Sequence, residues 1–423
     1  MYRQTYGLTH NGIWDWGQSR FNLYYEKTNK TRMGEGSTGR VEGMINDETY
    51  STSRYDSVKA SGELNFPVNW WLDQNITVGS EWTHNKLNDP SSMQQTNASG
   101  VDVDGTSGDG ASRNGKNSES LSAIYFEDNI EAAPGTDIIP GLRLDYHSRF
   151  GANWSPSLNF SQGLGDYFTL KAGIARVFKA PNLYQSSDSY LLATNGNGCP
   201  AGTTSGSCYL LGNSGLKPEI SVNKEIGLEF EHHGYQAGVT YFRNDYKNKI
   251  VAGDTLVGKT SNGYSIYLWE NGGKALVEGL EGTVMVPVIR DTLDWRTNFT
   301  YMINSKNKDT GNPLSIIPKY TINTMLDWLV TDALTASATW TMYGRQKPRQ
   351  NAEIRNEEGS MSSREIGAYS VVGVGMKYDL TRNFRVNAGI SNVLNKKVYR
   401  EADGASTYNE PGRAYYTGLT YSF

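Results

Sequence analysis

Apolar and polar side chains alternate along most of this chain in stretches of about ten residues, each followed by a turn. Leu142, Leu144 and Tyr146 stand at alternate positions, for example, and Arg143 and Asp145 lie between them. The same alternation runs through residues 58–66, 293–301 and 384–390. Because a period of two places successive side chains on opposite faces of a strand, the pattern predicts a series of amphipathic antiparallel β-strands.

Short connections alternate with long ones between these stretches. The short ones, such as residues 134–136 and 381–383, are tight turns, whereas the long ones are rich in Gly, Ser, Asn and Asp. The long connections run over residues 28–52, 87–118, 179–218, 252–263, 305–315, 348–363 and 397–411. Tight turns on one side and long loops on the other are typical of an outer-membrane β-barrel. The sequence therefore predicts an all-β, transmembrane antiparallel β-barrel.

The spacing of the turns predicts about 17 strands, which is more than a β-sandwich holds. Bacterial single-chain barrels have even strand numbers, and plugged transporters have about 22 strands. We therefore expect residues 1–423 to be the C-terminal part of one β-barrel domain, with roughly five strands and an N-terminal plug domain missing from it. The absence of a signal peptide after Met1 agrees with an N-terminal truncation. The first and last strands should then not pair with each other.

The composition agrees with a barrel in a membrane. The chain has 27 Tyr, 10 Trp, 12 Phe and 46 Gly. Tyr and Trp are enriched at membrane–water interfaces. Its mean hydropathy is −0.57, which a barrel tolerates because lipid-facing and lumen-facing residues alternate. A net charge of −4 gives no support for nucleic-acid binding.

The only two cysteines are Cys199 and Cys208, in a stretch rich in Gly, Ser and Thr. A C-x₂-C zinc spacing is absent, so one local disulfide is favoured over two free thiols. Such a bond would place this loop in an oxidising compartment such as the periplasm or the cell surface.

The chain ends on an alternating aromatic strand. Tyr415, Leu419, Tyr421 and Phe423 stand at alternate positions, with Thr417 between the first two, and Phe423 is the last residue. An apolar strand that ends in a C-terminal Phe is similar to the signal that the barrel-assembly machinery reads. The alternative is an aromatic terminus that arose by chance.

Catalytic patterns are absent from the sequence. The five histidines fall in no H-E-x-x-H motif, and no G-x-S-x-G element is present. Asp145 and His147 share a strand face without a nucleophile beside them, so lumen polarity explains them better. We therefore expect no enzyme, no metal site and no resident cofactor.

Several segments together resemble the ferric enterobactin receptors of the TonB-dependent outer-membrane class. These are LTHNGIWDWG (8–17), NWSPSLNFSQGLGDYFTLKAGIARVFKAPNLYQ (153–185), NKEIGLEFE (223–231), VTYFRNDYKNKIVAG (239–253), GGKALVEGLEG (272–282), SIIPKYTIN (315–323) and YNEPGRAYY (408–416). The resemblance implies a bacterial outer-membrane receptor that binds ferric enterobactin, or a related ferric catecholate siderophore, at its outer loops. It also implies transport past a plug driven by the TonB complex, contacts with outer-membrane lipid and lipopolysaccharide, and assembly by the barrel-assembly machinery.

The implied ligand is triply negative and has aromatic faces, which calls for Arg or Lys with Tyr nearby. In the segment TRMGEG (31–36), Arg32 aligns with a loop arginine that is linked to ligand binding in the family. Composition alone adds the other candidate ligand-binding residues, which are Arg40, Arg113, Lys116, Tyr190 and Tyr209. A solvated surface charge is the alternative interpretation for each of the basic residues.

Two other functions compete with the receptor hypothesis. A general diffusion porin has 16–18 strands, so the strand number alone is compatible with it. A soluble all-β binding protein would require the aromatic alternation to be core packing. The long loops and the matching segments favour the receptor.

Overall fold

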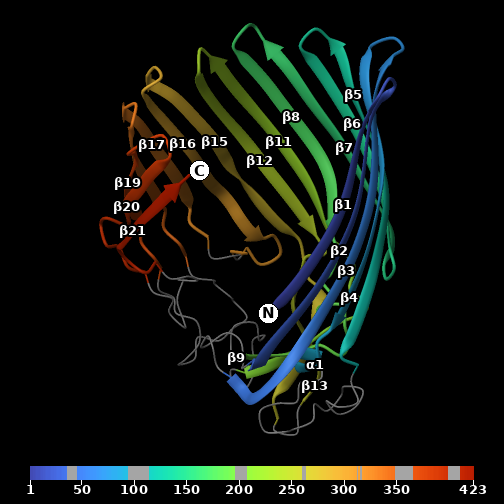
Figure 1. The fold of residues 1–423 in the computed structure, drawn as a ribbon. Coiled ribbons are helices and arrows are strands. Elements are labelled where there is room, and N and C mark those ends of the chain that lie inside the picture. The colour runs from blue at the N-terminus through green and yellow to red at the C-terminus, as the bar shows by residue number, and fades with distance from the viewer. Residues whose placement is uncertain are drawn as a thin grey trace.

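The computed structural model describes residues 1–35, 45–93, 114–195, 207–259, 263–311, 313–314, 317–347, 365–398 and 410–423. Within these residues, 17 strands form one antiparallel sheet that curves into an open wall (Figure 1). Each wall strand pairs with the wall strand that follows it in the chain. The wall strands are β1 (Tyr2–Trp14), β2 (Gly17–Glu35), β3 (Ile45–Asn69), β4 (Asp73–Asn88), β5 (Lys116–Ala133), β6 (Thr136–His147), β7 (Gly151–Leu164), β8 (Phe168–Lys179), β11 (Glu219–His232), β12 (Tyr235–Lys247), β15 (Ala275–Ile289), β16 (Leu293–Asn307), β17 (Tyr320–Thr331), β18 (Leu334–Tyr343), β19 (Tyr369–Asp379), β20 (Phe384–Ser391) and β21 (Ala414–Tyr421). The predicted all-β barrel architecture and its strand number are confirmed.

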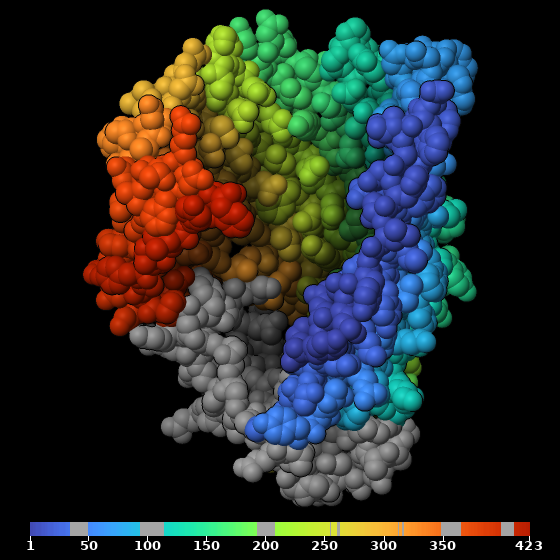
Figure 2. Space-filling view, viewed as in Figure 1, coloured from blue at the N-terminus to red at the C-terminus, as the bar shows by residue number. Residues whose placement is uncertain are grey.

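The two edge strands of the wall stand apart. In the part of the chain that the structure describes, β1 pairs with β2 and β21 pairs with β20, and the two edges do not pair with each other. Figure 2 shows the interior of the wall through the space between them. The prediction that the first and last strands leave the wall unsealed is therefore confirmed.

One end of the wall carries short turns, and we call it the turn end. The turn between β11 and β12 consists of His233 and Gly234, which both have positive φ (49° and 85°), as a two-residue hairpin turn of the primed type requires. The opposite end, which we call the loop end, carries the long connections and lies lowest in Figure 1. The predicted asymmetry is thus present in the structure.

The two faces of the wall differ in chemistry. On β6, Tyr146 is 63% exposed, whereas its neighbours Asp145 and His147 are 1% and 2% exposed. We call the face with Leu142 and Tyr146 the apolar face and the opposite one the polar face. In an outer-membrane barrel the apolar face meets lipid and the polar face meets the lumen.

The connection predicted over residues 28–52 is wrong, because strands occupy most of it. β2 continues to Glu35 and β3 begins at Ile45, so only residues 36–44 lie between them. Thr31 pairs with Thr52, and their hydroxyls are 2.9 Å apart. Cross-strand pairs of this kind extend a ladder without apolar alternation, which is why the pattern missed these residues.

A second, four-stranded sheet lies at the loop end and was not predicted. It consists of β9 (Leu191–Asn195), β10 (Ser207–Leu211), β13 (Ile250–Lys259) and β14 (Ser265–Asn271), in the order β13-β14-β10-β9. β10 and β14 run parallel, and Leu191 and Ile266 are fully buried in its core. The prediction that residues 252–263 form a loop is therefore wrong, since β13 covers most of them. Short strands that pair across distant connections leave no periodic signal in the sequence.

A single helical turn, α1 (Pro90–Met93), follows β4 at the loop end. Among the residues that the structure describes, no helix is long and apolar enough to cross a membrane.

Candidate functional site

A buried carboxylate organises the loop end of the wall. Asp89, directly after β4, has no exposed side-chain surface. Its two carboxylate oxygens accept hydrogen bonds from the hydroxyls of Ser91 (2.7 Å), Ser92 (3.0 Å) and Tyr184 (2.8 Å). The guanidinium of Arg32, whose side chain is 16% exposed, lies 3.4 Å from the same carboxylate. We call Arg32, Asp89, Ser92, Tyr184 and Tyr190 the mouth cluster.

The local sequence explains how Asp89 comes to lie there. Asp89 caps α1, since the backbone N–H groups of Ser92 and Met93 donate to its carboxylate and its carbonyl (3.3 and 3.0 Å). Pro90 occupies the first helical position, where a missing N–H costs no hydrogen bond. Met93 is fully buried against Leu183, which anchors the turn. The cap thus fixes the carboxylate at one place beside the wall.

Two tyrosines complete the mouth cluster. The rings of Tyr184 and Tyr190 lie 5.0 Å apart at 51°. Burial raises the pKa of Tyr190 to about 12, and burial together with Asp89 raises the pKa of Tyr184. Burial alone would raise the pKa of Asp89, but the hydroxyl donors and the charge of Arg32 outweigh it, so this pKa lies below its ordinary value. Both tyrosines are therefore neutral and Asp89 is ionised at neutral pH.

The charges of the mouth cluster compensate each other. The Arg32 cation and the Asp89 anion leave the pair without net charge, so the cluster as a whole does not attract an anion strongly. What it does is join three segments that are distant in the chain: β2, the β4–β5 connection and the β8–β11 connection. Arg32 contributes to this junction through hydrogen bonds to Asp89 and to Ser92 (3.0 Å).

The predicted ligand residues fall in different places. Arg32 and Tyr190 belong to the mouth cluster, and Lys116 begins β5 opposite Asn88, beside the cluster, with an exposed side chain. Arg40 and Arg113 lie outside the described residues. The structure thus brings together three of these predicted residues.

Tyr209 belongs to a different environment. It is 7% exposed and packs in the core of the second sheet, edge-on to Tyr264 at 6.3 Å. Its neighbour Cys208 is buried and takes part in a disulfide. Because Cys199 lies outside the described residues, the predicted pairing of the two cysteines stays a prediction.

The predicted assembly signal forms the last wall strand. On β21, Tyr415, Leu419 and Tyr421 are exposed and pair with apolar residues of β20. Phe423 lies beyond the end of β21 and is fully exposed. Recognition of this strand during assembly stays a prediction.

A cationic pocket at the loop end was missed by the sequence analysis. It has a volume of about 810 Å³ and lies between the β16–β17 and β18–β19 connections. Its lining residues include no acidic residue and four basic ones, which are Lys306, Lys319, Arg345 and Lys347. Lys319 lies 4.9 Å from the ring centre of Tyr301, and Arg345 lies 3.5 Å from Glu365 outside the pocket. The volume is in the range of small-molecule sites.

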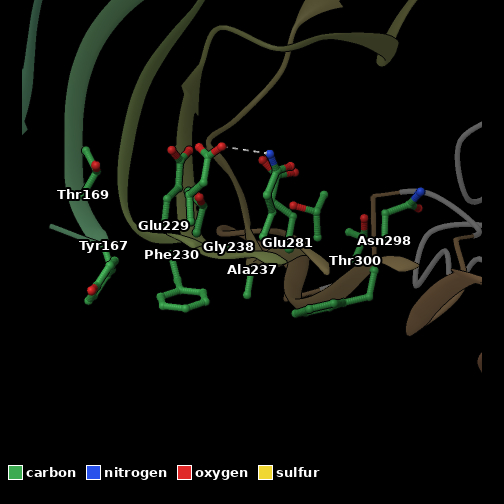
Figure 3. Close-up of a pocket in the computed structure, with 15 residues that line it drawn as sticks. Tyr167, Thr169, Glu229, Phe230, Ala237, Gly238, Glu281, Asn298 and Thr300 are labelled. Carbon is green, nitrogen blue, oxygen red and sulfur yellow. Dashed lines mark hydrogen bonds between the residues drawn. The ribbon is translucent and has the colours of Figure 1, made fainter. Parts of the chain in front are cut away.

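An acidic cavity lies at the opposite, turn end of the wall. Its volume is about 490 Å³, and Glu229, Glu231 and Glu281 line it (Figure 3). Figure 3 shows Glu229 and Glu281 on one face of the sheet and Phe230 on the other, as the alternation requires. The amide of Gln236 donates to Glu231 at 3.3 Å. The two ends of the wall therefore carry charges of opposite sign around their cavities.

Sequence reasoning missed Asp89 and Tyr184. The tetrapeptide from Asp89 to Ser92 contains a capping signal, an Asp followed by Pro, and this could have located α1. The contact with Tyr184 joins residues 95 positions apart in the chain. No local pattern in one sequence reports such a contact.

Comparisons with known proteins give one consistent result. The profile of the family described as "TonB dependent receptor-like, beta-barrel" matches residues 1–393. The whole chain is 53% identical to the ferric enterobactin receptor PirA of Pseudomonas aeruginosa, covering 57% of that protein. It is 47% identical to a ferric enterobactin receptor of the same organism and 42% identical to the ferrienterobactin receptor of Escherichia coli, covering 58% and 59% of them.

Solved structures agree with these relatives. A variant of the ferric enterobactin receptor PfeA from Pseudomonas aeruginosa, in complex with enterobactin, superposes on the whole chain with a TM-score of 0.90 at 46% identity. The siderophore receptor PirA from Acinetobacter baumannii gives 0.87 at 43% identity. This chain covers 62% of each of those chains.

Proposed function

Because this chain belongs to the TonB-dependent receptor-like β-barrel family, we propose that its protein takes up ferric enterobactin, or a related ferric catecholate siderophore, across the outer membrane. The family resemblance predicted from the sequence is confirmed. The members of this family are receptors rather than enzymes.

One observation carries the proposal: relatives named as ferric enterobactin receptors match the chain over its full length at 42–53% identity. The chain spans 57–59% of the length of these relatives. Uptake, its dependence on the TonB complex and insertion by the barrel-assembly machinery are therefore proposed for the whole protein. The alternative of a diffusion porin has no comparable support.

The charge distribution supports ligand capture at the loop end. A triply negative chelate with aromatic faces is attracted by cations and stacks well against tyrosine. The cationic pocket supplies the charge, and the mouth cluster supplies two tyrosines in a fixed arrangement. The acidic cavity at the turn end would repel the same ligand. Capture therefore belongs at the loop end.

We propose Arg32, Lys116 and Tyr190 as residues that act near the bound chelate, with Arg32 acting chiefly by positioning the loops. Lys116 is exposed beside the mouth cluster, so its charge is available to a ligand. We also propose Arg40, Arg113 and Tyr209 as ligand-binding residues, and this part of the proposal is supported by the composition of the sequence alone. The disulfide between Cys199 and Cys208 and the assembly signal at the C-terminus are proposed in the same way.

Uptake by cells tests the proposal. The full-length protein is expressed in a strain that lacks its own catecholate receptors, with and without TonB, and uptake of radioactive iron on enterobactin is measured. The proposal predicts uptake only when both proteins are present. Equal uptake without TonB would indicate a diffusion porin, and no uptake in either strain would overturn the siderophore assignment.

A further inference from the structure

A cluster of charged side chains interrupts the apolar face of the wall near its loop end. On β11, Leu228 and Ile226 are exposed on this face, and Lys224 occupies the next position of the same face toward the loop end. On the neighbouring strand β12, the exposed Val239 pairs with Leu228, and Arg243, nearer the loop end, pairs with Lys224. Charged groups on a lipid-facing surface are costly at the bilayer midplane and cost little near the interface. The cluster therefore belongs at the level of the lipid headgroups.

One carboxylate gathers three cations in this cluster. Asp245 accepts hydrogen bonds from Lys308 (2.5 Å), from Lys224 (3.1 Å) and from Nε and Nη2 of Arg243 (3.0 and 3.2 Å). Lys224 and Arg243 are direct cross-strand partners, an arrangement that is unfavourable unless an anion lies between them. A single carboxylate cannot neutralise three cations.

The surrounding groups leave the surplus charge in place. Glu278 is the second anion, and it accepts hydrogen bonds from Tyr241 (2.8 Å) and Asn304 (2.5 Å) and lies 3.4 Å from Arg243. Lys247, the last residue of β12, occupies the next position on the same face beyond Asp245 and is exposed. Four cations thus accompany two carboxylates, which leaves a net charge of two positive. We call these six residues the interface charge cluster.

We propose that the interface charge cluster binds a phosphate group of lipopolysaccharide in the outer leaflet. Its place at the loop end of the apolar face, directly beyond exposed aliphatic side chains, matches a phosphorylated glycolipid whose acyl chains lie along the wall. The surplus positive charge matches the phosphate, and the carboxylates hold the cations in a fixed arrangement before the lipid arrives. This inference rests on the barrel fold and is independent of which siderophore the protein binds.

Lipid binding by the full-length protein tests this inference. The double variant Lys224→Gln/Lys308→Gln removes two cations and keeps the size of the side chains. Binding is measured in nanodiscs that contain either diphosphorylated lipid A or lipid A without phosphate. If each basic residue near an anionic headgroup contributes about fivefold, the loss of two should lower the affinity for diphosphorylated lipid A about 25-fold. Phosphate-free lipid A should bind weakly to both proteins.

A matched control lies on the polar face. Lys171 is exposed there and forms an ion pair with Glu229 at 2.7 Å, and Lys377 lies on the polar face of β19. The variant Lys171→Gln/Lys377→Gln should bind diphosphorylated lipid A as the unmodified protein does. Equal affinity in the two double variants, or equal affinity for both lipids, would overturn the inference. Binding of iron-loaded enterobactin by the same preparations verifies the fold and keeps this result separate from the proposed function.

Lys308 alone provides a second variant outside the strands, because it directly follows the end of β16. Lys308→Gln should lower the affinity for diphosphorylated lipid A about fivefold. An unchanged affinity in this variant and in the double variant would exclude the cluster as a phosphate site.

Discussion

The loop end and the turn end of the wall use ion pairs in different ways. At the loop end, Asp89 is fully buried, and its oxygens accept hydrogen bonds from three hydroxyls and from Arg32. At the turn end, Arg385 donates to Asp379 at 2.5 Å, but their side chains are 44% and 35% exposed. A buried, fully hydrogen-bonded charge fixes the geometry around it, whereas water screens an exposed pair. The mouth cluster therefore holds a fixed shape at the loop end, whereas the exposed Arg385–Asp379 pair flanks a hairpin turn and contributes little rigidity.

Asp89→Ala should have the largest effect on this comparison. It removes the acceptor of the mouth cluster and breaks the largely buried contact between Arg32 and Asp89, and breaking a buried pair of this kind costs roughly 3–5 kcal/mol. The loss should appear as faster hydrogen exchange at the amide of Met93 and faster proteolysis of the β4–β5 connection. An exchange rate equal to that of the unmodified protein would contradict the structural role of Asp89.

Tyr184→Phe should have the next largest effect, because it removes one charge-assisted hydrogen bond worth about 2 kcal/mol. Burial and the nearby Asp89 raise the pKa of Tyr184 above its ordinary value of 10.0, so the folded protein keeps this proton. The stabilisation is fully present below about pH 10 and declines as the pH rises further. Tyrosinate absorbance at pH 10.5 should therefore be the same with and without Tyr184, and a decrease in the variant would contradict the raised pKa.

Arg32→Ala should weaken binding of iron-loaded enterobactin by on the order of 1 kcal/mol, and more than Arg32→Lys does. If charge attraction is the cause, the difference shrinks as salt rises, and if loop positioning is the cause, it persists. Arg385→Ala, at the turn end, is the matched control and should leave binding unchanged. Unchanged affinity in Arg32→Ala at low salt would remove Arg32 from the site.

Asp379→Ala should have the smallest effect. The ion pair of Asp379 with Arg385 is exposed, so its loss should leave the thermal unfolding temperature unchanged within error. A clear decrease would show that the turn end also depends on its ion pairs, and the contrast between the two ends would then fail.

The sequence predicts the wall well because each wall strand carries its own signal. Leu142, Leu144 and Tyr146 alternate with polar residues on β6, and this pattern needs no distant partner. The extension of β2 to Glu35 was missed because its Thr and Ser ladder carries no apolar alternation. The second sheet was missed because β10 and β14 are parallel partners from separate connections.

The candidate site was harder to predict than the wall. Arg32 was found through the family resemblance, but its partner Asp89 comes from another connection and gives no signal beyond a helix cap. The basic residues of the cationic pocket come from β16 and two connecting segments, and only the folded chain brings them together. Local patterns specify strands, and long-range contacts specify the site.

Equilibrium binding of iron-loaded enterobactin to the full-length protein in outer-membrane fragments tests the central claim most directly. The unmodified protein should bind the complex saturably. Asp89→Ala at the loop end should weaken this binding strongly, and Glu229→Gln in the acidic cavity of the turn end should leave it unchanged. Absence of saturable binding by the unmodified protein, or equal losses in the two variants, would contradict capture of a ferric catecholate at the loop end.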